Sequence, residues 1–173
     1  MKRLLTTILI VFVLSISAVS CYSDEASEWY YKGVEYCNQG LYGKCIECLN
    51  KSIKLKPNVS DGYFVRGQAY YMTARYEEAI YDFTKTIKYY PSFSPGYFWR
   101  GRSYNEIKNS KKAISDFTKA IELDPENAEY YAHRGMVYDN NKKIYGLDEA
   151  ERDYRKACEL GNSFACDLLR SLY

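Results

Sequence analysis

Apolar and polar positions along this chain repeat with a step of thirty-four residues. Within each step the apolar residues recur at spacings of three and four, which predicts amphipathic helices, and a proline follows the second helix. Each step therefore predicts two helices joined by a tight turn. Four classes of residue keep this register: the glycines Gly33, Gly67, Gly101 and Gly135, the aromatic residues Trp29, Tyr63, Tyr97 and Tyr131, the tyrosines Tyr36, Tyr70, Tyr104 and Tyr138, and the prolines Pro57, Pro91 and Pro125.

The repeated glycines predict close contact between the two helices of each repeat. A glycine inside a helix costs about 1 kcal/mol relative to alanine, so a packing gain must offset each one. We expect the small residue twelve positions later, Ala79 for Gly67 and Ala113 for Gly101, to approach the glycine from the partner helix.

The order of aromatic, glycine, tyrosine, small, large apolar and proline positions resembles the tetratricopeptide repeat from Ala26 to Pro125. The resemblance implies an all-α fold, in which helix-turn-helix repeats stack into a right-handed superhelical solenoid. It places three complete repeats at residues 26–59, 60–93 and 94–127, and a fourth at residues 128–161.

The fourth repeat departs from this register. Ala150, Tyr154 and Ala157 come three residues late, after a polar loop from Asn140 to Gly146. The segment from Ala150 to Leu169 is similar to the longer Sel-like repeats of cysteine-rich exported bacterial proteins. We expect a final helix within residues 162–173 to cap the open end of the stack.

The same resemblance implies a binding surface. In this family the first helices of successive repeats line a concave groove that holds a peptide or a partner helix. Here Tyr30 and Val34 replace the lysine and asparagine with which chaperone-binding members hold a C-terminal carboxylate, so the resemblance does not extend to that ligand class. The residues that it places in the groove are Tyr30, Val34, Cys37, Phe64, Gln68, Tyr71, Phe98, Arg102, Asn105, Met136 and Asp139.

The first twenty residues have the layout of a secretory signal peptide. Lys2 and Arg3 precede an apolar stretch that is shorter than the ~18 residues of a spanning helix, so we expect cleavage and export, with a periplasmic, secreted or lipid-anchored product. Residues 18–20 fit an ordinary signal peptidase. Followed by Cys21 they also resemble a bacterial lipoprotein box, in which Cys21 carries the lipid, and that lipid would be the one link to a membrane.

Six cysteines in an exported chain indicate disulfides. Cys158 and Cys166 bracket Gly161 at a predicted helix-turn-helix corner, and Cys37 and Cys45 bracket Gly40 in the same way. We expect a disulfide in each pair, with buried free thiols as the alternative. Cys48 is left over, as a free or alternatively paired thiol.

Charge excludes two classes of partner. The chain has 24 basic and 22 acidic residues, and Lys2 and Arg3 belong to the leader, so the remainder is nearly neutral. A nucleic-acid-binding protein would be expected to have an excess of basic residues, and this sequence has none. Binding to anionic lipid would require a polybasic cluster, which the sequence also lacks. Arginines one residue before the glycines (Arg66, Arg100 and Arg134) and aspartates on the second helices (Asp82, Asp116 and Asp153) predict a ladder of ion pairs.

The sequence offers no catalytic set. His133 is the one histidine, and no serine or cysteine has an identifiable base and orienting acid. No Cys/His cluster has zinc spacing, so we expect no metal, no cofactor and no enzyme activity. The leading hypothesis is an exported protein-binding scaffold. The alternatives are a cell-wall-associated, penicillin-binding or β-lactamase-like role, which the Sel-like segment suggests, and a structural spacer in an assembly.

Overall fold

The computed structural model describes residues 25–172, and this part of the chain is helical apart from its turns. The predicted leader (1–20), Cys21 and Tyr173 lie outside the described residues. A first helix includes residues 25–38. It is followed by α2 (Tyr42–Leu55), α3 (Ser60–Met72), α4 (Tyr76–Tyr89), α5 (Ser94–Glu106), α6 (Ser110–Leu123), α7 (Ala128–Asn140), α8 (Lys142–Tyr145), α9 (Asp148–Glu159) and α10 (Ser163–Ser171).

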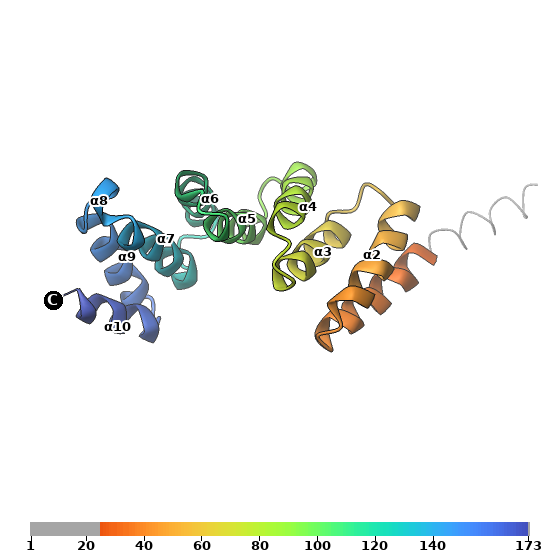
Figure 1. The fold of residues 1–173 in the computed structure, drawn as a ribbon, viewed down its shortest axis with the longest axis horizontal. Coiled ribbons are helices and arrows are strands. Elements are labelled where there is room, and N and C mark those ends of the chain that lie inside the picture. Colours follow the sequence, from red (N-terminus) through yellow and green to blue (C-terminus); the bar gives the residue numbers. More distant parts are fainter. Residues whose placement is uncertain (1–24, 173) are drawn as a thin grey trace, which may run out of the picture.

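The helices pair as the repeat predicts, and the pairs stack in a row along the long axis of the molecule (Figure 1). Within repeats α3 packs on α4, α5 on α6 and α7 on α9, and each second helix also contacts the first helix of the next repeat. Helix α3 also contacts α5, and α5 contacts α7, whereas no comparable contact joins α4 to α6 within the described chain. The first helices therefore form the inner, concave face. The predicted all-α, right-handed superhelical solenoid is confirmed.

The repeated glycines do make room for the partner helix, but for a different residue from the one expected. A Cβ atom on Gly67 would lie 2.8 Å from the ring of Phe83, and one on Gly101 would lie 3.0 Å from the ring of Phe117. The sequence predicts Ala79 and Ala113 as the approaching residues, whereas the nearest atoms belong to the Phe83 and Phe117 rings. The large residue sixteen positions after the glycine lies against it because its ring fills the space that the missing side chain leaves.

The arginine ladder forms, and it links neighbouring repeats. Arg66 donates two hydrogen bonds of 2.7 Å to the Asp82 carboxylate of its own repeat and one of 2.6 Å to Asn50 of the preceding repeat. Two further arginines repeat this arrangement: Arg100 contacts Asp116 and Thr84, and Arg134 contacts Asp153 and Thr118. Each guanidinium thus joins three helices, and its charge is balanced by a buried carboxylate.

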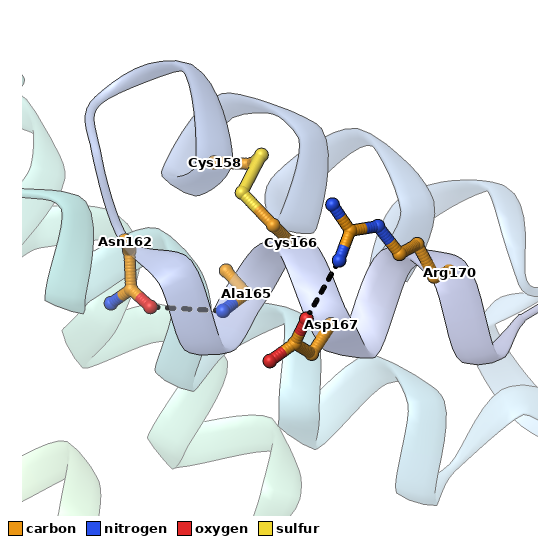
Figure 2. Close-up of a disulfide and its surroundings, with 6 residues drawn as sticks. All are labelled: Cys158, Asn162, Ala165, Cys166, Asp167 and Arg170. Carbon is orange, nitrogen blue, oxygen red and sulfur yellow. Dashed lines mark hydrogen bonds and ion pairs between the residues drawn. A yellow bond between two sulfur atoms is a disulfide. The ribbon is translucent and has the colours of Figure 1, made fainter.

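The two disulfides lie in the first and last helical hairpins of the described chain. Cys37 and Cys45 join the first helix to α2, with 5.2 Å between their Cα atoms. Cys158 and Cys166 join α9 to α10, with 4.8 Å between their Cα atoms (Figure 2). Cys48 is free and buried. The structure therefore has both disulfides that the sequence predicts.

The C-terminal cap is short and locally well specified. The side chain of Asn162 accepts a hydrogen bond of 2.9 Å from the backbone N–H of Ala165, which caps the start of α10, and Asp167 pairs with Arg170 one turn apart at 3.0 Å (Figure 2). Ala165 is fully buried against the last repeat. The sequence predicts an irregular polar loop after α7, whereas the structure has the short helix α8 there.

Candidate functional site

Most of the residues that the sequence predicts for the groove lie on the first helices and are half-buried. On the inner helices, side chains of the four successive repeats remain half-buried and open to solvent on one side. These are Tyr30 and Val34 of the first helix, Phe64, Gln68 and Tyr71 of α3, Arg102 and Asn105 of α5, and Met136 and Asp139 of α7.

Two predicted groove residues point elsewhere. Phe98 is 3% exposed and packs against Phe117 and Tyr130, so its assignment to the groove surface is wrong. The cause is Tyr130, which stands where the two preceding repeats have a glycine and covers the Phe98 ring. Cys37 forms its disulfide with Cys45 of α2, so its sulfur faces the partner helix and is not part of a ligand surface.

The middle of the concave face holds a central aromatic cluster, formed by Tyr71 of α3 with Trp99 and Arg102 of α5. The rings of Tyr71 and Trp99 meet edge to face, with 5.3 Å between their centroids. The Arg102 guanidinium lies 4.9 Å from the Tyr71 centroid and 4.5 Å from the Trp99 centroid. The cluster therefore spans the boundary between the second and third repeats.

Arg102 differs from the other arginines of the described chain. Each of those lies within ion-pair distance of a carboxylate, whereas Arg102 has aromatic rings as its neighbours. The Tyr71 hydroxyl donates a hydrogen bond of 3.4 Å to Glu106. Burial raises the pKa of Tyr71, and Arg102 offsets part of that rise. The phenol thus stays a neutral hydrogen-bonding group on the groove wall.

His133 is half-buried between repeats three and four. Its ring meets Phe98 edge to face at 5.1 Å and lies 6.0 Å from the Phe117 ring. Burial, with a smaller contribution from the Arg102 charge, lowers the pKa of His133 to about 4. The imidazole is therefore neutral at pH 7, and its 3.7 Å contact with Glu129 is a weak one. The role of His133 is inter-helix packing.

The N-terminal end of the groove contains a small aromatic cavity, the junction pocket, of about 120 Å³. It lies between the first two repeats. Its walls include Tyr30, Phe64, Tyr90 and Phe93, and Ser60 and Asp61 lie at its edge. Phe93 meets Phe64 edge to face at 4.9 Å and stacks on Tyr90 at 5.5 Å. The walls are thus held by contacts with one another.

The C-terminal end of the face is more polar. Asp139 lies 3.5 Å from the Lys142 ammonium at the end of α7. Met136 supplies the apolar surface there and packs beside the last hydrophobic cluster. The groove therefore changes from aromatic to polar along the stack.

Sequence reasoning missed Trp99, Tyr90 and Phe93 as groove-lining residues. Trp99 follows a predicted groove position directly, so its size was a usable signal. Tyr90 and Phe93 belong to the connection after α4. The predicted groove residues all come from the first helices of the repeats, so this prediction does not include the connection.

Other kinds of site are not found in the part of the chain that the structure describes. There, no group of three or more His, Cys, Asp or Glu side chains could hold a metal ion. Among residues 25–172, no helix combines the length and the apolar content needed to cross a bilayer.

The sequence is similar to family models of the tetratricopeptide repeat over residues 26–59, 60–93, 94–127 and 117–152. Comparison with curated protein sequences finds no match.

Several solved structures share the fold. A crystal structure of MamA is 23% identical, with a TM-score of 0.76, over 86% of this chain and 85% of that one. MamA from Desulfovibrio magneticus RS-1, residue 41 to the end, is 24% identical, with a TM-score of 0.75, over 80% and 76% of the two chains. The first repeat domain of Spaghetti (RPAP3), bound to the HSP90 peptide SRMEEVD, is 24% identical, with a TM-score of 0.67, over 69% and 94%.

Proposed function

Since the chain belongs to the tetratricopeptide repeat family, we propose that it is a non-catalytic scaffold whose concave face binds an extended peptide or a partner helix. The central aromatic cluster is the observation that supports this proposal most strongly. Aromatic and arginine side chains dominate the binding energy of protein interfaces. Here Tyr71, Trp99 and Arg102 are gathered on the concave face, half-buried and open on one side.

The cluster is well suited to a peptide because its parts are already ordered. Tyr71 and Trp99 have few side-chain torsions to fix, and each supplies a large contact area. The Arg102 guanidinium is held against both rings, so its donors are positioned before a ligand arrives. Binding then requires little further loss of conformational entropy.

The similar structure of Spaghetti, which is bound to an HSP90 peptide, supports a peptide as the ligand. The ligand chemistry is expected to differ here. Tyr30 and Val34 are aromatic and aliphatic, so the N-terminal part of the groove favours apolar or aromatic side chains over a terminal carboxylate.

We further propose that the protein works outside the cytoplasm, as a periplasmic, secreted or lipid-anchored protein. The two disulfides support this location, because structural disulfides form and persist in oxidising compartments and both are present in the folded chain. The intact mass of the native protein tests cleavage after residue 20 and distinguishes an acylated Cys21 from a free one.

Site-specific crosslinking tests the binding face. A photoreactive residue at Gln68, which is half-buried on the concave face, should form a defined crosslinked product in the native envelope. The same residue at Tyr81, which is 57% exposed on α4, is the control. A product from position 81 and none from position 68 would reject the concave face.

The two remaining hypotheses make different predictions. Turnover of a chromogenic β-lactam by the purified protein would favour the penicillin-related role over the scaffold. A defined oligomer without any groove ligand would favour the structural spacer.

A further inference from the structure

The junction pocket has features that the repeat itself does not require. At the equivalent positions one repeat later, Pro95 replaces Asp61, Asp124 replaces Tyr90 and Asn127 replaces Phe93. All four aromatic walls and the Asp61 carboxylate therefore occur together at the first junction. The next junction keeps the two rings of the first helices, Phe64 and Phe98, and has its carboxylate, Asp124, at the position of Tyr90.

The pocket stays open for an identifiable reason. Gly96 stands where the following repeat has Tyr130, the residue that covers Phe98. With no side chain at Gly96, Phe64 remains half-buried and forms part of the pocket wall.

The size of the pocket fits one side chain. Its volume of about 120 Å³ is well below the ~300 Å³ at which sites for small organic ligands begin. A cavity of this size can take one side chain of a larger partner and is too small for a whole organic ligand.

The charge of the pocket selects the type of side chain. Asp61 is exposed and accepts a hydrogen bond of 3.0 Å from Ser60, and no basic group of the described chain lies within ion-pair distance of it. No lysine or arginine lines the pocket. The Asp61 charge also contributes to the raised pKa of Tyr30, after burial, which is consistent with the two groups being close together.

From this arrangement we propose that the junction pocket binds a lysine or arginine side chain of the protein partner. The aliphatic stem packs between the rings of Tyr30, Tyr90 and Phe93, and the cationic end lies at the Asp61 carboxylate. Aromatic faces attract cations through their quadrupole, and the carboxylate adds charge complementarity. The inference rests on the proposed function, since it assigns one residue of the peptide that the concave face binds.

Peptide selection on the purified mature chain tests this assignment. Random peptides displayed on phage are selected against the parent protein, against Asp61→Asn and against Asp148→Asn. Asp148 is a matched control, since it is likewise an exposed carboxylate in the first turn of a helix. We expect a basic residue at a fixed position in peptides selected by the parent and by the control, and loss of that preference with Asp61→Asn.

One selected peptide then provides a quantitative measurement. Replacing its basic residue by norleucine, which keeps the stem and removes the charge, should weaken binding to the parent about tenfold, or 1.4 kcal/mol. The same replacement should change binding to Asp61→Asn little. The charged peptide should also lose affinity with added salt to a greater degree than the norleucine peptide.

Three results would overturn the assignment. The first is a set of selected peptides without a preferred basic residue, and the second is a basic preference that persists in Asp61→Asn. The third is a concentration-dependent dimer of the free protein that Tyr90→Ser dissociates, because a second copy of the chain would then fill the pocket. If peptides bind, Tyr71→Ala abolishes their binding and Asp61→Asn has no effect, the proposed binding of a basic side chain in the junction pocket is wrong and the proposed scaffold function still stands. If no peptide is selected at all, the proposed scaffold function fails with it.

Discussion

At the residue scale, the contact between Gly67 and Phe83 fixes how closely the two helices of a repeat approach. A Cβ atom at position 67 would lie 2.8 Å from the ring of Phe83, and that ring is fully buried. We predict that Gly67→Ala destabilises the protein by about 1–2 kcal/mol, as overpacked cores do. Urea unfolding measures the change.

Gly43 provides the matched control. It also lies in a helix, α2, but a Cβ atom there would meet nothing within 4 Å. Gly43→Ala should stabilise the protein by up to about 1 kcal/mol, because alanine is the better helix former. Equal effects of the two substitutions would contradict the packing explanation.

The Arg66 rung, which is the ion pair of Arg66 with Asp82 together with the hydrogen bond from Arg66 to Asn50, joins two repeats through a buried charge. Burial raises the pKa of the Asp82 carboxyl, and the two hydrogen bonds from Arg66 offset part of that rise, so the charged form depends on the arginine. We predict that Arg66→Ala costs about 3 kcal/mol, because it leaves an uncompensated buried charge. Replacing both residues, Arg66→Met with Asp82→Leu, should recover most of the loss.

Arg152 is the control for the rung. Its pair with Glu149 is exposed, so Arg152→Ala should change the unfolding free energy by less than about 1 kcal/mol. An Arg66→Ala protein as stable as Arg152→Ala would show that the rung contributes nothing.

His133 should make the stability of the fold depend on pH. Its pKa is about 4 in the folded chain and about 6.5 in an unfolded one. Between these values the unfolded state binds a proton that the folded state does not, so stability is fully present above about pH 6.5 and is lost as pH falls towards 4. The loss is at most about 3 kcal/mol.

Comparison of urea unfolding at pH 7 and pH 5 for the parent and for His133→Gln isolates this contribution. The variant should lose less stability than the parent over the same interval. Parallel losses in the two proteins would contradict a lowered pKa for His133 in the folded chain.

Single residues also show the limit of sequence-based prediction. Phe64 and Phe98 occupy the same register position, yet Phe98 is buried and Phe64 is half-exposed. The difference arises from Gly96 and Tyr130 in the following repeats. Exposure at a groove position is thus decided by a neighbour about thirty residues away, which a single-repeat pattern does not include.

At the element scale, the two disulfides staple the hairpins at both ends of the described stack. An end hairpin packs on one neighbour only, so it is the part of a repeat array that opens most readily. Both cross-links have a sequence separation of 8 residues. The chain-entropy estimate gives about 2.5 kcal/mol for each.

We predict that the paired substitution of Cys158 and Cys166 by alanine loosens the C-terminal end selectively. Hydrogen exchange should become faster in α10 and the end of α9, while the amides of α5 keep the protection of the parent. The melting temperature should fall, and a reducing agent should have less effect than on the parent. Unchanged exchange in α10 would show that the disulfide does not hold the end.

The sequence predicts helical elements well here because each helix repeats a pattern seen three or four times. The connection after α7 has no such copies, and α8 was missed there. The turn between the helices of a repeat shows a further local rule: Gly40, Ala74 and Lys108 share one register position, and all three have positive φ. Only the first has the residue type that this conformation favours, so composition alone does not reveal the turn.

At the scale of the whole molecule, the stack presents one continuous inner face built from the first helices. The curvature of this face follows from the repeat. The repeat can be recognised in the sequence alone, so the solenoid could be predicted. Its chemistry depends on which non-repeating side chains meet across boundaries. The meeting of Tyr71 with Trp99, and of Tyr90 with Phe93 and Phe64, required the three-dimensional arrangement.

The scaffold proposal is tested most directly by the affinity of one selected peptide for two variants of the same repeat. Tyr71→Ala removes a wall of the central aromatic cluster, and Tyr81→Ala removes a tyrosine that is 57% exposed on α4. Phe64→Ala is less suitable, because Phe64 also packs on Phe83. Both variants should keep the helical circular dichroism of the parent. Isothermal titration calorimetry should show a loss of affinity of about thirtyfold or more for Tyr71→Ala, equivalent to about 2 kcal/mol. The affinity of Tyr81→Ala should equal that of the parent. Equal affinities of the parent and Tyr71→Ala would contradict binding on the concave face.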